Sequence, residues 1–267
     1  MTVRYGAVLH ALQSLRGSVA ELDPTLAAVP YRVRTRGIAP LADIYLPARP
    51  TGASALLVHG GAFVIGSRRM KPMRFLAAQL VASGIAVCTI DYRMIFRGGR
   101  LDEAVDDVRA ALGFWCERAP GHGLDGDAVS MIGLSAGASL GLYAAAHRDA
   151  PLSRLACCFG LYETEHLRGL PSVIPRLLFR TRDRTKWRFG PAQPAVPTLL
   201  LHGDADGLVP VEQAHRLAAH RESLGLPTRL VVYPGAPHGF FNVPCTAADA
   251  AVRELVGHVD VSSRRAP

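Results

Sequence analysis

Short apolar runs alternate along this chain with stretches of helical periodicity. Two of the runs, Leu56-Leu57-Val58 and Leu230-Val231-Val232, are apolar at every position, as strands covered by helices on both faces must be. The alternation predicts an α/β fold, with a mostly parallel central sheet and helices on both of its faces. The predicted strands are residues 41–46, 55–59, 85–90, 128–133, 155–160, 198–202 and 228–233. The predicted helices cover about 72–83, 102–118, 136–148, 211–224 and 246–258.

One segment, residues 162–195, interrupts this alternation with prolines, glycines and many arginines and has no clean period. We interpret it as an insertion that forms a cap or lid over the carboxyl edge of the sheet, where open α/β sheets bind ligands. With 267 residues, the chain suits one large α/β domain over residues 1–267 that contains this insertion. Apolar positions from Val8 to Leu22 predict an amphipathic helix ahead of the first strand, and residues 259–267 are expected to be a frayed tail.

The composition is that of a globular protein, with 49% hydrophobic and 19% charged residues. No apolar run approaches the roughly 18 residues that a membrane span needs. Polar residues interrupt the N-terminal stripe, so we expect a cytoplasmic protein without a signal peptide. Five cysteines without metal-ligand spacing are expected to be reduced, buried thiols, and no metal site is predicted. The net charge of +8 comes from arginine, and because no nucleic-acid-binding motif accompanies it, no nucleic-acid partner is expected.

Ser135 is the leading candidate for chemistry, because it lies in Gly133-Leu134-Ser135-Ala136-Gly137 between a predicted strand and a predicted helix. The G-x-S-x-G spacing is typical of a serine at a sharp strand-to-helix turn, where glycines allow close backbone packing. The N-terminus of the helix and the amide of Ala136 would favour negative charge that develops near the hydroxyl. The competing interpretation is a turn of small residues that serves only helix–sheet packing.

A second candidate segment, His59-Gly60-Gly61, directly follows a predicted strand. Its glycines would let backbone N–H groups turn toward a bound carbonyl oxygen. The amides of Gly60 and Gly61, together with that of Ala136, are therefore the predicted oxyanion hole. We expect His59 to be a hydrogen-bonded structural residue rather than a base. The alternative for the whole segment is an ordinary Gly-Gly turn.

A nucleophilic serine needs a base and an acid, and two downstream loops supply candidates. His238 lies in a Gly/Pro-rich loop after the last predicted strand, and an imidazole suits proton transfer at neutral pH. Asp204 and Asp206 both follow the strand at 198–202, and their spacing alone does not choose between them. The one that is not the acid would be a turn or helix-cap residue.

Taken together, residues 40–255 resemble the α/β-hydrolase esterase/lipase group that includes the hormone-sensitive-lipase-like and acetyl-esterase-like enzymes. The motifs that carry the resemblance are His59-Gly60-Gly61-Ala62-Phe63, Asp91-Tyr92-Arg93, Gly133-Leu134-Ser135-Ala136-Gly137, His202-Gly203 with Asp206 and Val209-Pro210, and Pro237-His238-Gly239-Phe240. The resemblance implies an α/β-hydrolase fold. It also implies that Asp206 rather than Asp204 is the acid, and that Tyr92 and Arg93 are structural.

Several positions depart from the group's pattern. Ala62 stands where many members have a third glycine, and if this position needs a positive φ, alanine costs roughly 1–2 kcal/mol. Leu134 replaces an acidic residue that commonly precedes the nucleophile, and Ala138 replaces a glycine that follows it. The loop after Arg93 lacks the usual proline-bearing continuation. These departures affect the subfamily and the substrate more than the chemistry.

The resemblance implies a serine hydrolase that cleaves a carboxylic ester of a small or medium acyl substrate, without a metal or an organic cofactor. Ser135, Asp206 and His238 are the implied catalytic residues. Amide or formamide hydrolases of the arylformamidase type and thioesterases would use the same residues and are the alternatives. A non-catalytic ligand receptor of the same fold is disfavoured, because the three residues are retained together. The expected partner is a small-molecule acyl substrate, and association into a homodimer is left open.

The predicted cap is strongly basic. Its sequence predicts either a solvated basic face or an inner lining that binds an anionic part of the substrate. The basic residues are Arg168, Arg176, Arg180, Arg182, Arg184, Lys186 and Arg188.

Overall fold

The computed structural model describes residues 22–34, 37–95, 97, 99–147, 151–165 and 192–260. The predicted N-terminal helix therefore lies outside the described residues, apart from its last position. The same holds for residues 166–191 of the predicted cap, with all seven of its basic side chains, and for the tail beyond residue 260. Within the described residues, no helix is both long and apolar enough to cross a bilayer.

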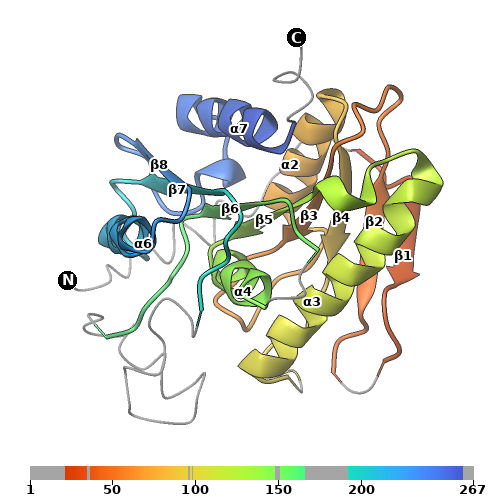
Figure 1. The fold of residues 1–267 in the computed structure, drawn as a ribbon, viewed down its shortest axis with the longest axis horizontal. Helices are drawn as coiled ribbons and strands as arrows, with labels where there is room; N and C mark the ends of the chain where they lie inside the picture. The colour runs from red at the N-terminus through yellow and green to blue at the C-terminus, as the bar shows by residue number, and fades with distance from the viewer. Residues whose placement is uncertain are drawn as a thin grey trace.

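The described chain is built on an eight-stranded sheet in the order β1-β2-β4-β3-β5-β6-β7-β8 (Figure 1). β1 pairs antiparallel with β2, and β2 with β4, whereas every other neighbouring pair is parallel. The predicted α/β fold with a mostly parallel sheet is therefore confirmed. The strands are β1 (Leu26–Pro30), β2 (Leu41–Tyr45), β3 (Ser54–Val58), β4 (Ala86–Ile90), β5 (Val129–Leu134), β6 (Arg154–Cys158), β7 (Thr198–Gly203) and β8 (Thr228–Tyr233).

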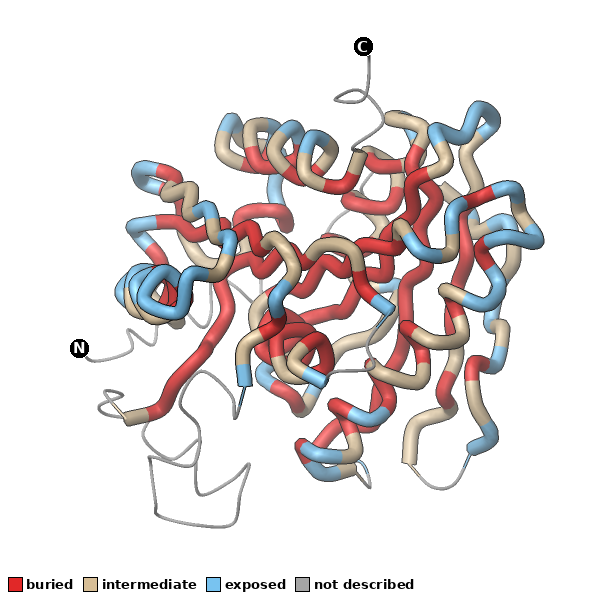
Figure 2. The backbone as a smooth tube through the Cα atoms, viewed as in Figure 1, coloured by how far each residue is buried: buried red, intermediate tan, exposed pale blue. Residues whose placement is uncertain are grey.

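Helices cover both faces of the sheet, as predicted, and enclose a buried core on each side (Figures 1 and 2). α2 and α7 cover one face, and α3, α4 and α6 cover the other. The central strands β3 and β5 are buried at every position, which explains why most of their residues are apolar. The α-helices are α2 (Lys71–Ala82), α3 (Leu101–Arg118), α4 (Ala136–Ala145), α6 (Glu212–Ser223) and α7 (Thr246–Val259). The short 3₁₀ helices among the described residues are η1 (Ala119–His122), η2 (Gly126–Ala128) and η5 (Phe240–Asn242).

The predicted strands and helices agree with the observed ones to within three residues at each end. Two expectations differ. Leu230-Val231-Val232 lies on the edge strand β8 and is only partly buried, because β8 has a neighbouring strand on one side only. The strand β1 was not predicted: its alanine-rich sequence is largely exposed, contains Ala28 at a φ of 54° and ends in proline, so it carries little strand signal.

The parallel strands determine where a site can form. The chain leaves β3, β5, β7 and β8 at the same carboxyl edge of the sheet, and each strand is followed there by one of the loops that contain the candidate residues. Segments that are far apart in the sequence are thereby brought to one edge.

Candidate active site

Ser135 lies at a strained turn between β5 and α4, with a φ of 51° and a ψ of −115°. Its amide donates to the carbonyl of Cys158 on β6 at 2.9 Å. The two glycines of the motif are needed for space. A Cβ at Gly133 would lie 2.3 Å from the Gly137 oxygen, and a Cβ at Gly137 would lie 2.2 Å from the Val58 oxygen. The sharp turn that the G-x-S-x-G spacing predicts is thus present, with the serine at the carboxyl edge.

The glycine segment after β3 lies against this turn. A Cβ on Gly60 would be 3.1 Å from the Cβ of Ser135, so the two backbones are in close approach. Gly61 has a φ of 111°, a conformation that side chains disfavour. Within the described residues, the amides of Gly60, Gly61 and Ala136 donate to no other protein group, which leaves three N–H groups available beside the serine. Ala62 has a φ of 52°, so the alanine at this position is in the left-handed region.

His59 fixes the orientation of this segment. The Gly60 carbonyl can only accept, so the 2.7 Å bond between it and His59 Nδ1 assigns the proton to Nδ1. Because the carbonyl and the next N–H point in opposite directions across a trans peptide, this bond turns the Gly61 amide away from His59. The His59 ring stacks on the Tyr92 ring with 4.2 Å between the ring centroids, and the Tyr92 hydroxyl donates to the His59 carbonyl at 3.0 Å. Burial lowers the pKa of His59 to about 4, so the ring is neutral near pH 7.

The loop after β7 separates the two candidate acids. Asp206 is buried, and its Oδ1 accepts hydrogen bonds from the amides of Leu208 at 2.9 Å and Val209 at 2.8 Å. Asp204 is exposed, and its Oδ1 accepts the Gly235 amide at 2.6 Å. The structure therefore directs the Asp206 carboxylate toward the loop that contains His238, whereas the Asp204 carboxylate binds the backbone amide of Gly235 and so joins the two loops.

His238 lies between the serine and Asp206. Its Nδ1 is 2.7 Å from Asp206 Oδ2, and its Nε2 is 3.0 Å from Ser135 Oγ. An ionised carboxylate only accepts, so Nδ1 carries the proton and Nε2 is free to accept the serine hydroxyl proton. Three side chains separated by up to 103 residues thus form one continuous hydrogen-bonded chain.

The surroundings of Asp206 favour its ionised form. Burial alone would raise the pKa of Asp206, but the attraction to a protonated His238 ring and hydrogen bonds from His202 and His238 outweigh burial and hold the pKa of this carboxyl below its usual range. Asp206 is therefore ionised wherever the protein is folded near neutral pH.

The rings of Phe159 and His202 also contact this hydrogen-bonded chain, and sequence reasoning gave neither residue a role. Phe159 follows β6 with a φ of 42°, and its ring meets the His238 ring edge-on at 5.1 Å. His202, on β7, places Nε2 at 3.3 Å from Asp206 Oδ2. Its motif was visible in the sequence, but its contact depends on how the loop after β7 folds back.

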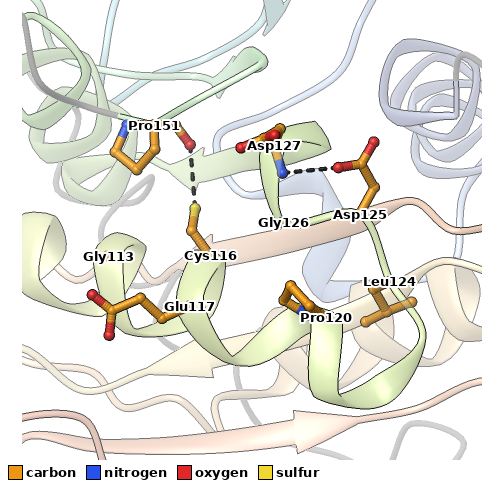
Figure 3. A pocket seen from close by; sticks show the side chains of 9 residues that line it. All are labelled: Gly113, Cys116, Glu117, Pro120, Leu124, Asp125, Gly126, Asp127 and Pro151. Carbon is orange, nitrogen blue, oxygen red and sulfur yellow. Dashed lines mark hydrogen bonds between the residues drawn. The ribbon is translucent and has the colours of Figure 1, made fainter.

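A surface hollow lies at the opposite end of the sheet, between the end of α3 and the start of β5 (Figure 3). Cys116 donates its thiol to the Pro151 carbonyl there at 3.2 Å, and burial raises the pKa of Cys116 to about 11. This thiol is a poor nucleophile, and the hollow is not part of the serine site. In the described part of the chain, no group of three or more His, Cys, Asp or Glu side chains is arranged to hold a metal ion. The hollow is lined by Gly113, Cys116, Glu117, Pro120, Leu124, Asp125, Gly126, Asp127 and Pro151.

Comparison with known proteins leads to esterases. The BD-FAE family model matches residues 42–158, which include the glycine segment and the serine turn. An isoprenylcysteine alpha-carbonyl methylesterase of Arabidopsis thaliana is 25% identical over 229 residues, 73% of this chain and 53% of that protein. Esterase LipC of Mycobacterium tuberculosis is 28% identical over 227 residues, 73% of this chain and 54% of that protein. An ethyl acetate hydrolase of Pseudomonas putida is 28% identical over 218 residues, 72% and 67% of the two chains.

The chain spans about half the length of the plant and mycobacterial relatives. Solved structures extend the likeness over most of this chain. A thermophilic esterase of Thermogutta terrifontis with bound propionate superposes with a TM-score of 0.66 at 21% identity, covering 82% of this chain and 88% of that one. A sugar hydrolase of Lactococcus lactis superposes with a TM-score of 0.73 at 16% identity, covering 86% and 97%. At these identities the likeness establishes a shared fold.

Proposed function

We propose that the chain is a member of the α/β-hydrolase esterase family and that it hydrolyses carboxylic esters of small or medium acyl groups through an acyl-enzyme intermediate, as its similarity to esterases supports. The observation that carries this proposal is the continuous chain from Ser135 Oγ to His238 Nε2 at 3.0 Å and from His238 Nδ1 to Asp206 Oδ2 at 2.7 Å. In this proposal Ser135 is the nucleophile, His238 the base and Asp206 the acid of a catalytic triad.

The first half of the reaction forms the acyl-enzyme. As Ser135 Oγ attacks the ester carbonyl carbon, its proton moves to Nε2 of His238. The charge that develops on the imidazole is stabilised by Asp206, and the negative charge on the carbonyl oxygen is stabilised by an oxyanion hole. We assign this hole to the amides of Gly60, Gly61 and Ala136, because none of the three donates to another protein group among the described residues and Ala136 begins α4. The intermediate then collapses, and His238 gives its proton to the departing alkoxide.

The second half regenerates the enzyme. A water molecule attacks the acyl carbon while His238 Nε2 takes a proton from it, and the same oxyanion hole receives the charge. Collapse of this intermediate breaks the bond to Ser135 Oγ, returns the proton to the serine and releases the carboxylic acid. The steps use only protein groups and water, so the proposal requires no metal or organic cofactor.

The remaining assignments are also proposals. We assign the chain to one domain with an insertion at about 162–195, supported by contacts from α6 to both ends of that segment. Gln213 accepts the amides of Tyr162 and Glu163 at 2.9 Å each, and Arg221 donates to the Pro194 and Val196 carbonyls. A cytoplasmic location is supported by the five cysteines, which are all free.

The test is a substrate panel. Nitrophenyl esters from acetate to palmitate, an aryl formamide and an aryl thioester are compared by kcat/KM, with Ser135→Ala as the control for background hydrolysis. We expect the esters of short and medium acids to be the best substrates. A formamide or thioester that exceeds every ester by more than about tenfold would contradict the ester assignment and favour the corresponding alternative.

A further inference from the structure

His202 is a buried histidine that the mechanism above does not use. It lies next to the end of β7, is fully buried, and directs its Nε2 toward two acceptors at once. These are the Val209 carbonyl oxygen at 2.9 Å and the Asp206 Oδ2 oxygen at 3.3 Å. Since a carbonyl oxygen can only accept, Nε2 must carry the ring proton, and this N–H is shared between the two oxygens.

The other nitrogen of the ring supports the same tautomer. His202 Nδ1 is buried and has no hydrogen-bond partner among the described residues. A proton there would be a buried donor without an acceptor, which is energetically unfavourable. The geometry therefore favours a single state of His202, with one proton on Nε2.

The contact with His202 completes the surroundings of the Asp206 carboxylate. Oδ1 receives the amides of Leu208 and Val209, and Oδ2 receives His238 Nδ1 at 2.7 Å and His202 Nε2 at 3.3 Å. All four acceptor positions of the carboxylate are thus occupied. The titratable groups that face it are the two histidines, one from β7 and one from the loop after β8, because Asp204 is turned to Gly235.

Val209 closes the arrangement. Its amide donates to Asp206 Oδ1 at 2.8 Å, and its carbonyl accepts from His202 at 2.9 Å. The loop that carries Asp206 is therefore fastened to β7 by the same imidazole that contacts the carboxylate. Removing the Nε2–H would leave the Val209 carbonyl and one side of Oδ2 without their donor.

We propose that His202 is a positioning residue of this site. Its Nε2–H holds Asp206 Oδ2 in place and disperses part of the negative charge that this oxygen presents to His238. The proposal rests on the proposed function, since it gives His202 a part in the same triad. A hydrogen bond to a carboxylate disperses its charge, so His202 limits how strongly Asp206 stabilises the protonated form of His238. Without His202, Asp206 stabilises protonated His238 more strongly. As the pH falls, His238 then becomes protonated, and can no longer act as the base, at a higher pH.

The test compares two substitutions of His202 whose side-chain nitrogens lie at different distances from the backbone. The side-chain nitrogen of glutamine can take the place of a histidine Nε2, whereas that of asparagine is one bond shorter and cannot. For His202→Asn we expect kcat on a nitrophenyl ester to fall about 10- to 100-fold with little change in KM, because a small displacement of the acid misaligns His238. We also expect the acid limb of the kcat/KM profile to move to higher pH by about 0.3–1 unit. His202→Gln should return both values most of the way to those of the unmodified protein.

A matched control is available on α7. His258 Nε2 donates to the Leu155 carbonyl at 3.0 Å, so it makes the same type of bond on a different element. His258→Asn should lower stability without moving the acid limb. A folded His202→Asn protein whose acid limb stays in place, or a His202→Gln protein that behaves like His202→Asn, would overturn the proposal and leave His202 as a structural residue.

A second measurement needs no variant. In ¹⁵N-histidine spectra at pH 8, we expect His202 to carry its proton on Nε2, and a proton on Nδ1 would overturn the proposal even if His202→Asn does not fold. This readout also separates the two proposals. Unmodified protein that cleaves no ester in the substrate panel contradicts the proposed function, whereas the His202 tautomer is observed independently of turnover.

Discussion

The assignment of the triad acid can be tested with a single-atom exchange at two neighbouring positions. Asp206→Asn replaces one carboxylate oxygen by an NH₂ group in a place where every neighbour is a donor. The amides of Leu208 and Val209 cannot change their protonation, so the remaining oxygen of the asparagine should face them. The NH₂ group then faces His238, which must present Nδ1 as an acceptor.

This rearrangement determines the expected magnitude. A His238 that accepts at Nδ1 carries its proton on Nε2 and cannot take the proton of Ser135. A wrong histidine tautomer of this kind costs about 10⁴-fold in kcat, which corresponds to roughly 5.4 kcal/mol in the activation barrier. Asp204→Asn keeps an oxygen that can accept the Gly235 amide, and its side chain is exposed. We expect its kcat to stay within about threefold of the unmodified protein and its stability to change by less than about 0.5 kcal/mol.

The assay is kcat on a nitrophenyl ester that the unmodified protein turns over, measured under saturating conditions and divided by the folded fraction from circular dichroism. Urea unfolding of both variants separates loss of chemistry from loss of fold. If Asp204→Asn loses more activity than Asp206→Asn, or if Asp206→Asn keeps more than a tenth of the original kcat, the reasoning from the hydrogen-bond donors around Asp206 is refuted.

Four further outcomes are expected. Ser135→Ala should lower kcat about 10⁶-fold, and the double variant with His238→Ala should lose little more, as kinetic comparison of the single and double variants will test. Ala62→Gly should raise the free energy of unfolding by about 1 kcal/mol in urea, because Ala62 has a φ of 52°; an unchanged or lower value would contradict the strain argument. Arg221→Met should lower that free energy by about 2–4 kcal/mol with kcat per folded molecule unchanged, because it leaves buried carbonyls such as those of Pro194 and Val196 unpaired. Asp43 and Asp206 have folded-state pKa values below the ordinary 3.8, so the stability they supply is present above about pH 4 and is lost as the pH falls further; unfolding curves from pH 6 to pH 3 that do not weaken would contradict this.

The fold was predictable because its central strands carry a strong and local signal. Strands such as β3 and β5 are buried at every position, so most of their five or six consecutive residues are apolar. The strand β1 has no such signal, since its pairing with β2 is antiparallel, irregular and at the edge of the sheet. A strand of this kind is defined by its partner, and its own residues do not reveal it.

The candidate site divides in the same way. The serine turn was predictable because its constraints leave a short sequence pattern: Gly133 must be small because of atoms within the turn, and Gly137 because of the neighbouring strand β3. The choice between Asp204 and Asp206 was not predictable from spacing, because both follow β7 within a few residues. What distinguishes them are contacts across 31 or 32 residues, to Gly235 in one case and to His238 in the other.

The loops after β7 and β8 are joined so closely that they act as one structural unit. The amides of Asp204 and Ala205 donate to the Tyr233 and Ala236 carbonyls, and a Cβ at Gly203 would lie 2.1 Å from the Ala236 oxygen. The distance between Asp206 and His238 is therefore determined by backbone pairing between these loops. Ser135 is fastened separately, through its amide to Cys158 on β6. Ser135 and His238 are thus anchored through different backbone hydrogen bonds, and Phe159, the residue that follows Cys158, meets the His238 ring edge-on at 5.1 Å, so its packing bears on the contact between His238 and Ser135.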